Sequence, residues 1–206
     1  MRFLKNHWDK IYSTKQPGEV SWTQEIPETS LEFIHKARLS KNAHIIDIGG
    51  GDSKLVDFLL EEGFENITVL DISSMALERT KQRLGVHANK IKWIISDILD
   101  FAPSDQYDFW HDRATFHFLT EGPQIEKYLS TARQAVKDNG YVTVGTFSTR
   151  GPEKCSGLDI KQYREETLAA EFKNGFEKME CKAVDHKTPF HSIQNFLFCC
   201  FQRHLN

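Results

Sequence analysis

Carboxylates follow three short apolar runs of this chain, at the points where strands would end. Asp47 lies two residues before a glycine triplet, Gly49-Gly50-Gly51, and Asp71 and Asp97 each close or follow a later apolar run. An ionised carboxylate accepts two hydrogen bonds side by side, and glycine lets a ligand approach the backbone closely. In an open α/β sheet a ligand lies beyond the carboxyl ends of the strands. These residues therefore predict a binding site for a molecule that carries paired donors, such as a diol.

The glycine turn does not fit two common phosphate-binding motifs. A nicotinamide or flavin fingerprint needs a third glycine where this chain has Lys54, and a Walker loop needs the order Gly-Lys-Ser/Thr, which Ser53-Lys54 lacks. The pattern that remains is D-x-G-x-G followed by an acid. Gly51 precedes Asp71 by 20 residues, the separation that a β-α-β unit sets.

This pattern resembles the S-adenosylmethionine site of class I methyltransferases, with Asp71 and Asp97 in register. The resemblance implies S-adenosylmethionine as cofactor, with the glycines beside its methionyl part and Asp71 accepting both ribose hydroxyls. It also implies Asp97 on the adenine amino group and Ile98 against the ring. The predicted cofactor contacts are Asp47, Gly49, Gly50, Gly51, Asp71, Ile72, Asp97, Ile98 and Trp22.

Three segments further along the chain extend this resemblance over nearly its whole length. They are 110–120, 151–158 and 186–189, and they resemble a widespread group of bacterial class I methyltransferases whose acceptors are unassigned. The likeness implies the fold and the cofactor, and it carries no acceptor with it.

The acceptor is expected at the ends of the fourth and fifth strands. Asp112 is predicted to touch the methyl donor or the acceptor, with a helix cap as the alternative. His111 or His117 is a candidate general base, since an unperturbed histidine pKa of about 6.5 allows proton uptake at neutral pH, and a core histidine is the alternative. Arg113 is predicted either to clamp an acceptor carboxylate or to pair with Asp112 or Glu121.

Residues 1–40 are expected to form a cover over this pocket, with helical pieces that Pro17-Gly18 and Ile26-Pro27 interrupt. Trp22 is predicted to belong to a lid that excludes water. Tyr12 is a candidate acceptor contact, although Trp8 and Tyr12 also have the spacing of one helix face, which favours core packing.

The elements that position these residues alternate along the chain. Helical patterns at 54–62, 74–84 and 125–136 separate apolar runs at 44–48, 67–71, 91–95, 107–112 and 141–147. Such alternation predicts a doubly wound, mostly parallel sheet. Runs at 176–185 and 196–201 are joined too briefly for a helix, so they are expected to pair antiparallel. We therefore predict an α/β fold with a seven-stranded sheet and an antiparallel C-terminal strand, in a single domain of residues 1–206 whose Rossmann-like core is 41–206.

Composition excludes several classes of protein. The 26 Lys+Arg and 29 Asp+Glu give a net charge of -3, without the basic excess of nucleic-acid-binding proteins. Apolar runs are too short for a membrane span, and the N-terminus lacks the apolar stretch of a signal peptide. The four cysteines form no CxxC pair, so neither a metal site nor a disulfide framework is expected, and Cys155 is expected to pack in a loop. We predict a cytoplasmic protein that is a monomer or a weak homodimer.

Three functions are compatible with these features. The first hypothesis is methyl transfer by in-line displacement to a small-molecule acceptor. The second is a protein lysine methyltransferase, because the start Trp8-Asp9-Lys10-Ile11-Tyr12 resembles the W-D-x-x-Y start of such enzymes, although the Asp-x-x-Tyr element expected after Asp112 is absent. The third is an S-adenosylmethionine-binding module without catalysis.

Overall fold

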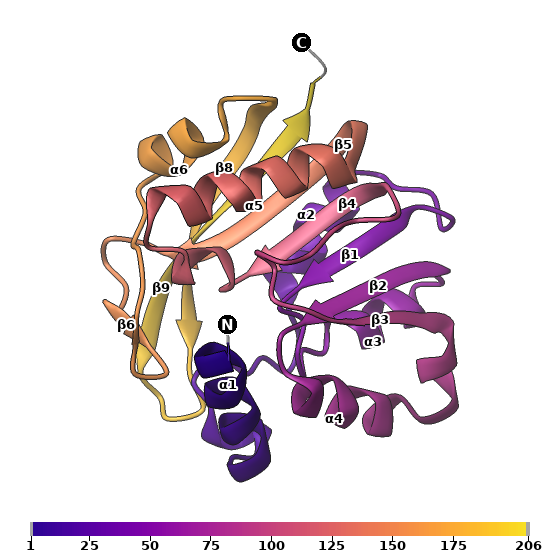
Figure 1. Ribbon diagram of the computed structural model, residues 1–206, viewed down its shortest axis with the longest axis vertical. Coiled ribbons are helices and arrows are strands. Elements are labelled where there is room, and N and C mark those ends of the chain that lie inside the picture. Colours follow the sequence, from indigo (N-terminus) through magenta and orange to yellow (C-terminus); the bar gives the residue numbers. More distant parts are fainter. Residues whose placement is uncertain (1, 205–206) are drawn as a thin grey trace.

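The computed structural model describes residues 2–204 of the chain. Its centre is a seven-stranded sheet with the strand order β3-β2-β1-β4-β5-β9-β8 (Figure 1). The strands from β3 to β5 in this order are parallel, and β9 is antiparallel to both of its neighbours, β5 and β8. The strands are β1 (His44–Ile48), β2 (Asn66–Asp71), β3 (Ile91–Ile95), β4 (Tyr107–Arg113), β5 (Val136–Phe147), β8 (Phe176–Lys187) and β9 (Ile193–Arg203). The predicted fold class is confirmed.

Helices cover both faces of the sheet, and each face has its own apolar core. One core joins the strands to α5 and α6, with Trp110 and Tyr128 at its centre. The other joins them to α2, α3 and α4, around Phe33 and Leu55. Strands covered on both faces are mostly apolar, which explains why Ile45, Ile46 and Ile48 of β1 are all buried. The helices are α1 (Arg2–Thr14), α2 (Glu28–Lys36), α3 (Leu55–Glu61), α4 (Ser74–Leu84), α5 (Gly122–Ala135) and α6 (Glu165–Phe172), with 3₁₀ turns η1 (Pro17–Glu19), η2 (Gly85–Lys90) and η3 (Phe116–Phe118).

The boundary between α5 and β5 differs from the prediction. The expected helix 125–136 ends at Ala135, and the strand begins at Val136 instead of at 141. Asn139, with a φ of 61°, lies inside the strand, where the register with β4 shifts between the Tyr107 and Phe109 pairs. The Asn-Gly pair therefore accommodates a strand irregularity and does not terminate the helix.

Two elements between residues 150 and 175 were not predicted. A small hairpin pairs β6 (Lys154–Cys155) with β7 (Leu158–Asp159), and α6 follows it. Ser156 and Gly157 have φ values of 52° and 79°, so both central residues of the hairpin turn adopt the left-handed region that a two-residue turn favours. This segment lies beside the end of β5, where the Tyr163 N–H donates to the Phe147 carbonyl at 3.1 Å.

The expectation that no cysteine forms a disulfide is wrong for one pair. Cys181 of β8 and Cys199 of β9 face each other in the sheet register and form a disulfide, with Cα atoms 4.1 Å apart. The pairing requires the register of two strands, which the cysteine spacing does not contain. Cys155 and Cys200 are free and buried. Disulfides are rare in the cytosol, so the cysteines do not support the predicted cytoplasmic location.

Strand register brings the chemistry-bearing residues to one edge. Asp47 of β1 pairs with His111 of β4, and Ile48 pairs with Asp112, so the two strands end side by side. The N-terminal segment crosses this edge, with α1 in front of the strand ends in Figure 1. Within residues 2–204, every helix is too short or too polar to span a lipid bilayer.

Candidate active site

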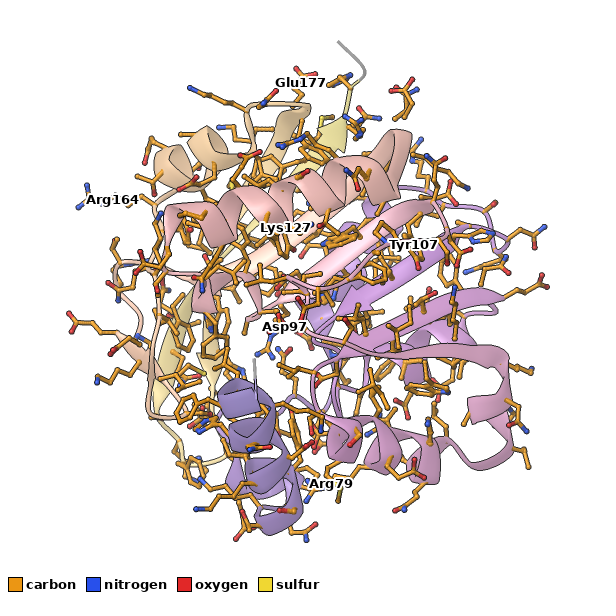
Figure 2. The ribbon with its side chains drawn as sticks, in the orientation of Figure 1. Arg79, Asp97, Tyr107, Lys127, Arg164 and Glu177 are labelled. Atoms are coloured by element: carbon orange, nitrogen blue, oxygen red, sulfur yellow. A yellow bond between two sulfur atoms is a disulfide. The ribbon has the colours of Figure 1, made fainter. Side chains whose placement is uncertain are left out.

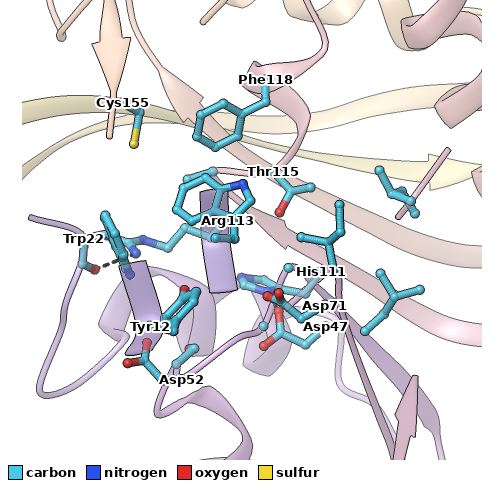
Figure 3. A pocket seen from close by; sticks show the side chains of 18 of the residues that line it. Tyr12, Trp22, Asp47, Asp52, Asp71, His111, Arg113, Thr115, Phe118 and Cys155 are labelled. Atoms are coloured by element: carbon cyan, nitrogen blue, oxygen red, sulfur yellow. Dashed lines mark hydrogen bonds and ion pairs between the residues drawn. The ribbon is translucent and has the colours of Figure 1, made fainter. Parts of the chain in front are cut away.

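A cavity of about 240 Å³ lies at the carboxyl edge of the sheet, where β1, β2, β3 and β4 end (Figure 3). The glycine turn forms its floor, and residues of α1 and of the segment 17–27 lie across it. The predicted residues that line it are Tyr12, Trp22, Asp47, Gly49, Gly50, Asp71, Ile72, Asp97, Ile98, His111 and Arg113. The three strand-end acids are thus part of the lining, together with polar residues that were not predicted, such as Asp52, Arg83 and Thr115.

The turn after β1 requires glycine, because a side chain at these positions would clash with neighbouring residues. Gly49 has a φ of 65°, and a Cβ atom at this position would lie 1.8 Å from Oγ1 of Thr115. Gly51 has a φ of 45°, and its Cβ would lie 2.8 Å from the Tyr12 hydroxyl. The N–H groups of Gly49 and Gly50 both donate to the Leu70 carbonyl, at 2.7 and 3.2 Å. The turn is therefore anchored to β2 and keeps open a space that a ligand can occupy.

Asp71 is the acid at the end of β2, next to this turn. One of its oxygens, Oδ1, accepts the Ser73 N–H at 2.7 Å. Burial raises the pKa of Asp71 to about 7, with a smaller contribution from the nearby carboxylates Asp52 and Asp47. A carboxylate held in a dry wall with spare lone pairs is suited to accept hydrogen bonds from a diol.

Asp97 and Ile98 follow β3 on the far side of the same cavity. Oδ1 of Asp97 accepts the Leu99 N–H at 3.0 Å, which fixes the carboxylate, and Ile98 is buried beside it. Asp97 is labelled between the strand ends and α1 in Figure 2. A fixed acid next to an apolar surface fits a planar ring that carries an amino group.

Asp47 and His111 are buried side by side below the glycine turn. His111 Nδ1 lies 2.7 Å from Asp47 Oδ1, and His111 Nε2 lies 2.8 Å from the Ser30 hydroxyl of α2. Both ring nitrogens therefore have partners in the protein. His111 reaches the cavity wall, but this geometry makes it a positioning residue for Asp47.

Asp112 and His117 are outside the cavity lining, in contrast to their prediction as catalytic residues. Asp112 is fully buried; it accepts the N–H groups of Thr115 and Phe116 at 2.9 and 3.2 Å and the Tyr128 hydroxyl at 2.7 Å. These bonds support the capping alternative. Asp112 is absent from the cavity lining because side chains alternate along a strand, and this one points to the face of the sheet that α5 covers.

His117 is also fully buried, with rings of Phe118 and Phe147 against it. Its Nδ1 accepts the Phe147 N–H at 3.4 Å. Burial lowers the pKa of His117 to about 3, with a smaller contribution from the charge of Arg113. His117 is therefore a neutral histidine of the core, which was the alternative interpretation of the sequence.

Four aromatic rings form an apolar wall of the cavity. Trp8 contacts Tyr12, Trp22 and Phe118, with ring centroids 6.3, 5.8 and 5.3 Å apart. Tyr12 contacts Trp22 at 6.2 Å. All four rings line the cavity, so Trp8, which was expected in the core, and Phe118, which was not singled out, belong to the site. The i, i+4 spacing of Trp8 and Tyr12 predicts that they share one face of α1, but it does not predict what that face covers.

The helix that carries Trp8 and Tyr12 is fastened to α4. Asp9 accepts a hydrogen bond from the Ser73 hydroxyl at 2.6 Å, and Ser73 is also the N-cap of α4. Arg79 of α4 donates to the Lys15 carbonyl and lies over the Tyr12 ring, 5.9 Å from its centroid. Arg79 is labelled beside the lower end of α1 in Figure 2. The predicted cover is therefore an ordered helix with specific contacts.

Two further cavity residues were not assigned to the site from the sequence. Asp52 follows the glycine turn, and burial raises its pKa, with Arg79 and Arg83 acting in the opposite direction. Cys155 lines the wall from the β6–β7 hairpin, and burial raises the pKa of its thiol to about 11. A protonated, buried thiol agrees with the packing role expected of it.

Comparison with known proteins agrees with this site. Residues 46–142 match a family model described as a methyltransferase domain. The chain is 26% identical to EEF1A lysine methyltransferase 2 of Danio rerio over 190 residues, which covers 84% of this chain and 75% of that protein. It is 25% identical to the Homo sapiens protein of the same name over 193 residues, with coverage of 85% and 75%.

Solved structures share the fold. One, from work on the conversion of a disulfide bond into a thioacetal group during echinomycin biosynthesis, superposes with a TM-score of 0.81 and 16% identity, and covers 98% of this chain and 94% of its own. The N-methyltransferase NodS of Bradyrhizobium japonicum, in complex with S-adenosyl-l-homocysteine, superposes with a TM-score of 0.71 and 15% identity, with coverage of 97% of both chains.

Proposed function

We propose that this chain, which is a class I S-adenosylmethionine-dependent methyltransferase, transfers the methyl group to an amine nitrogen, and specifically to the side-chain amine of a protein lysine. The observation that carries the choice of nitrogen is the environment of His111. It is the histidine of the cavity lining, and both of its ring nitrogens already have protein partners.

The choice of acceptor atom follows from this lack of a free histidine base, with Asp71 and Asp97 assigned to the cofactor. A hydroxyl acceptor needs a group that removes its proton as the new bond forms. An amine needs only to lose its extra proton beforehand, and burial in a dry pocket lowers the pKa of a lysine from its usual value of about 10.4. The wall of Trp8, Tyr12, Trp22 and Phe118 supplies such a surface.

The residues of this chain fit the cofactor. The glycine turn leaves the space that its amino-acid arm requires, Asp71 offers oxygens for the ribose diol, and Asp97 with Ile98 suits the adenine. When bound, S-adenosylmethionine supplies an electrophilic methyl carbon on a sulfonium, so that an amine lone pair forms the C–N bond while the C–S electrons return to sulfur. The carboxylates favour the cationic cofactor over its neutral product.

The protein itself contributes alignment and exclusion of water. Anchoring of the glycine turn to Leu70 and of Asp47 to His111 fixes one side of the site. The contacts of α1 with α4 fix the aromatic side. Holding two reactants in line accounts for about 7–11 kcal/mol of the barrier in favourable cases.

Identity to the lysine methyltransferases supports a protein acceptor, because it extends over 84% of the chain and is not confined to the cofactor half. A small-molecule amine is the second candidate. The buried guanidinium of Arg113 favours it, since a small acceptor that carries a carboxylate would satisfy that charge.

The test is incubation of the purified protein with methyl-labelled S-adenosylmethionine and an extract of the source organism from which the gene has been deleted. Asp71→Ala, which removes the ribose acceptor, is the control. We expect label in a protein band, recovered after hydrolysis as ε-N-methyllysine. Label found only in the low-mass fraction would support the small-molecule candidate, and base-labile label released as methanol would overturn nitrogen as the acceptor.

The remaining expectations concern the whole protein. We propose that it acts in the cytoplasm as a monomer or weak homodimer and that it binds no nucleic acid. Light scattering after gel filtration tests whether the protein is a monomer or a weak homodimer. Retention on a heparin column at low salt would contradict the absence of nucleic-acid binding.

A further inference from the structure

Arg113, at the end of β4, carries a buried guanidinium that the protein only partly satisfies. Nη1 donates to the Trp22 carbonyl at 2.9 Å. Nε and Nη2 are buried and have no hydrogen-bond partner among residues 2–204. The sequence alternatives, pairing with Asp112 or with Glu121, are not realised, because Asp112 bonds to Tyr128 and the η3 backbone and Arg113 has no ion pair in this part of the chain.

No carboxylate forms an ion pair with the guanidinium among residues 2–204, although the charge of nearby Asp47 favours its protonated form. Its central carbon lies 4.9 Å from the centroid of the Phe196 ring. The Cys155 thiol beside it is protonated, since burial raises its pKa to about 11, and Asp47 is engaged with His111. Burial lowers the pKa of Arg113 to about 10, which leaves the group charged at neutral pH. A buried charge without a partner is costly, and proteins keep one where a ligand completes it.

Arg113 also stands at a junction between two cavities. The second cavity, of about 650 Å³, lies between the segment 18–29 and the β8–β9 connection. Three residues line both cavities, and they are Thr23, Gln24 and Arg113. In Figure 3 the Arg113 side chain extends towards Trp22, and its dashed hydrogen bond reaches the Trp22 backbone. The Arg113 side chain thus lies where an outer groove meets the inner site.

We propose that Arg113 is a carboxylate-binding residue at this junction, with Nε and Nη2 donating two parallel hydrogen bonds to one carboxylate. A planar guanidinium is suited to this bidentate geometry, whereas a lysine ammonium is not. Two sources have this chemistry. One is the methionyl arm of the cofactor, because Arg113 follows Asp112, the register partner of Ile48, and so lies beside the glycine turn. The other is an acceptor that enters through the outer groove.

The inference rests on the proposed cofactor but not on the identity of the acceptor. Calorimetry therefore compares two ligands, S-adenosylhomocysteine and 5′-methylthioadenosine, which lacks the amino-acid arm. Wild type, Arg113→Met and Arg113→Lys are titrated with each. If the carboxylate belongs to the cofactor, Arg113→Met loses about tenfold to hundredfold in affinity for S-adenosylhomocysteine, a change of about 1.4–2.8 kcal/mol. Arg113→Lys loses less, and 5′-methylthioadenosine binds all three proteins equally.

If the carboxylate belongs to the acceptor, S-adenosylhomocysteine binds the variants as it binds wild type. The complex with wild type then binds succinate in preference to its uncharged analogue succinamide, and the Arg113→Met complex does not distinguish them. The inference is overturned if Arg113→Met changes neither the affinity for S-adenosylhomocysteine nor the preference for succinate. Failure of the proposed lysine acceptor leaves both outcomes unaffected.

Two controls separate recognition from folding. Arg133→Met removes an arginine that pairs with Glu126 on α5, away from both cavities, and should change neither titration. The melting temperature of Arg113→Met should equal or exceed that of wild type without ligand, because the substitution removes a charge that lacks a partner. A large fall in melting temperature would instead assign Arg113 a structural role through Trp22.

Discussion

His111 Nδ1 lies 2.7 Å from Asp47 Oδ1, so the acid that opens the glycine turn is bound to the strand beside it. The two residues are register partners in β1 and β4. The histidine that the sequence offers as a general base thus holds a carboxylate of the binding turn in place.

His111→Ala is therefore expected to act mainly through the cofactor site. It leaves Asp47 and Ser30 without a buried partner, at a cost of about 1–3 kcal/mol in the free energy of unfolding for each such group. Affinity for S-adenosylhomocysteine should fall, and the loss in kcat should be the same factor from pH 6 to pH 9. Ser30→Ala, which removes the Nε2 partner alone, should keep kcat within about threefold. A loss confined to one limb of the pH profile would indicate that His111 is a base after all.

Asp71 should make cofactor binding depend on pH. Its pKa of about 7 means that the ligand-free protein carries a neutral carboxyl below pH 7 and a carboxylate above it. Because the ionised form is the better diol acceptor, affinity for S-adenosylhomocysteine should rise with pH and level off above pH 8. Calorimetry between pH 5.5 and 9 checks this.

The same group should affect stability with the opposite sign. A carboxyl whose folded pKa is raised from 3.8 to about 7 stabilises the folded state in its protonated form, so stability declines as pH rises across that interval. Asp71→Asn removes this decline and should bind the ligand weakly at every pH. An unchanged pH profile in the variant would contradict the assignment.

Gly49→Ala should be among the most destabilising changes in the turn. It places a Cβ at a φ of 65° and 1.8 Å from Thr115 Oγ1, so backbone strain of about 1–2 kcal/mol is added to a steric clash. Gly63→Ala is the matched control, since its φ is 84° and no heavy atom lies within 4 Å of the new Cβ. Urea unfolding should give a clearly larger loss at Gly49. The double variant Gly49→Ala, Thr115→Ala should recover part of the difference, and equal losses at the two glycines would refute the clash.

Trp8 should matter for turnover more than for folding. Its ring contacts Tyr12, Trp22 and Phe118 across the cavity wall. Trp8→Ala opens the wall to water and should lower kcat/KM by about tenfold to hundredfold, whereas Trp8→Phe retains an apolar ring and should lose less than about threefold. Asp9→Asn tests the attachment of α1 separately. If both Trp8 variants keep wild-type rates, the aromatic wall has no role in transfer.

The Cys181–Cys199 disulfide should stabilise the sheet edge without touching the site. It closes a separation of 18 residues between β8 and β9, and a loop of this size corresponds to about 3 kcal/mol in the chain-entropy view. Cys181→Ser with Cys199→Ser should lower the free energy of unfolding by up to that amount and leave the affinity for S-adenosylhomocysteine unchanged. Reducing agent should do the same to wild type and nothing to the double variant.

The parts of the site that depend on local sequence could be predicted from the sequence alone. The D-x-G-x-G turn, Asp71 and Asp97 each sit at the end of a β-strand, and strand, turn and helix depend on neighbours a few residues apart. Alternating strands and helices likewise predicted that most strands of the sheet are parallel, whereas the strand order came from the structure. The change from helix to strand at Val136 was misplaced, since an apolar residue fits both the helical and the strand periodicity.

Tertiary structure alone decided what the other side chains do. His111 finds its partners 64 and 81 residues away, and Asp112 finds Tyr128 across the sheet face. Among residues 2–204, Arg113 forms no ion pair with an acid, although Asp112 precedes it in sequence. Whether a polar side chain becomes a cap, a support or a binding group depends on which hydrogen bonds are left after packing. That remainder is set by strand register and by the face on which each residue emerges, and neither is encoded within a few neighbouring residues.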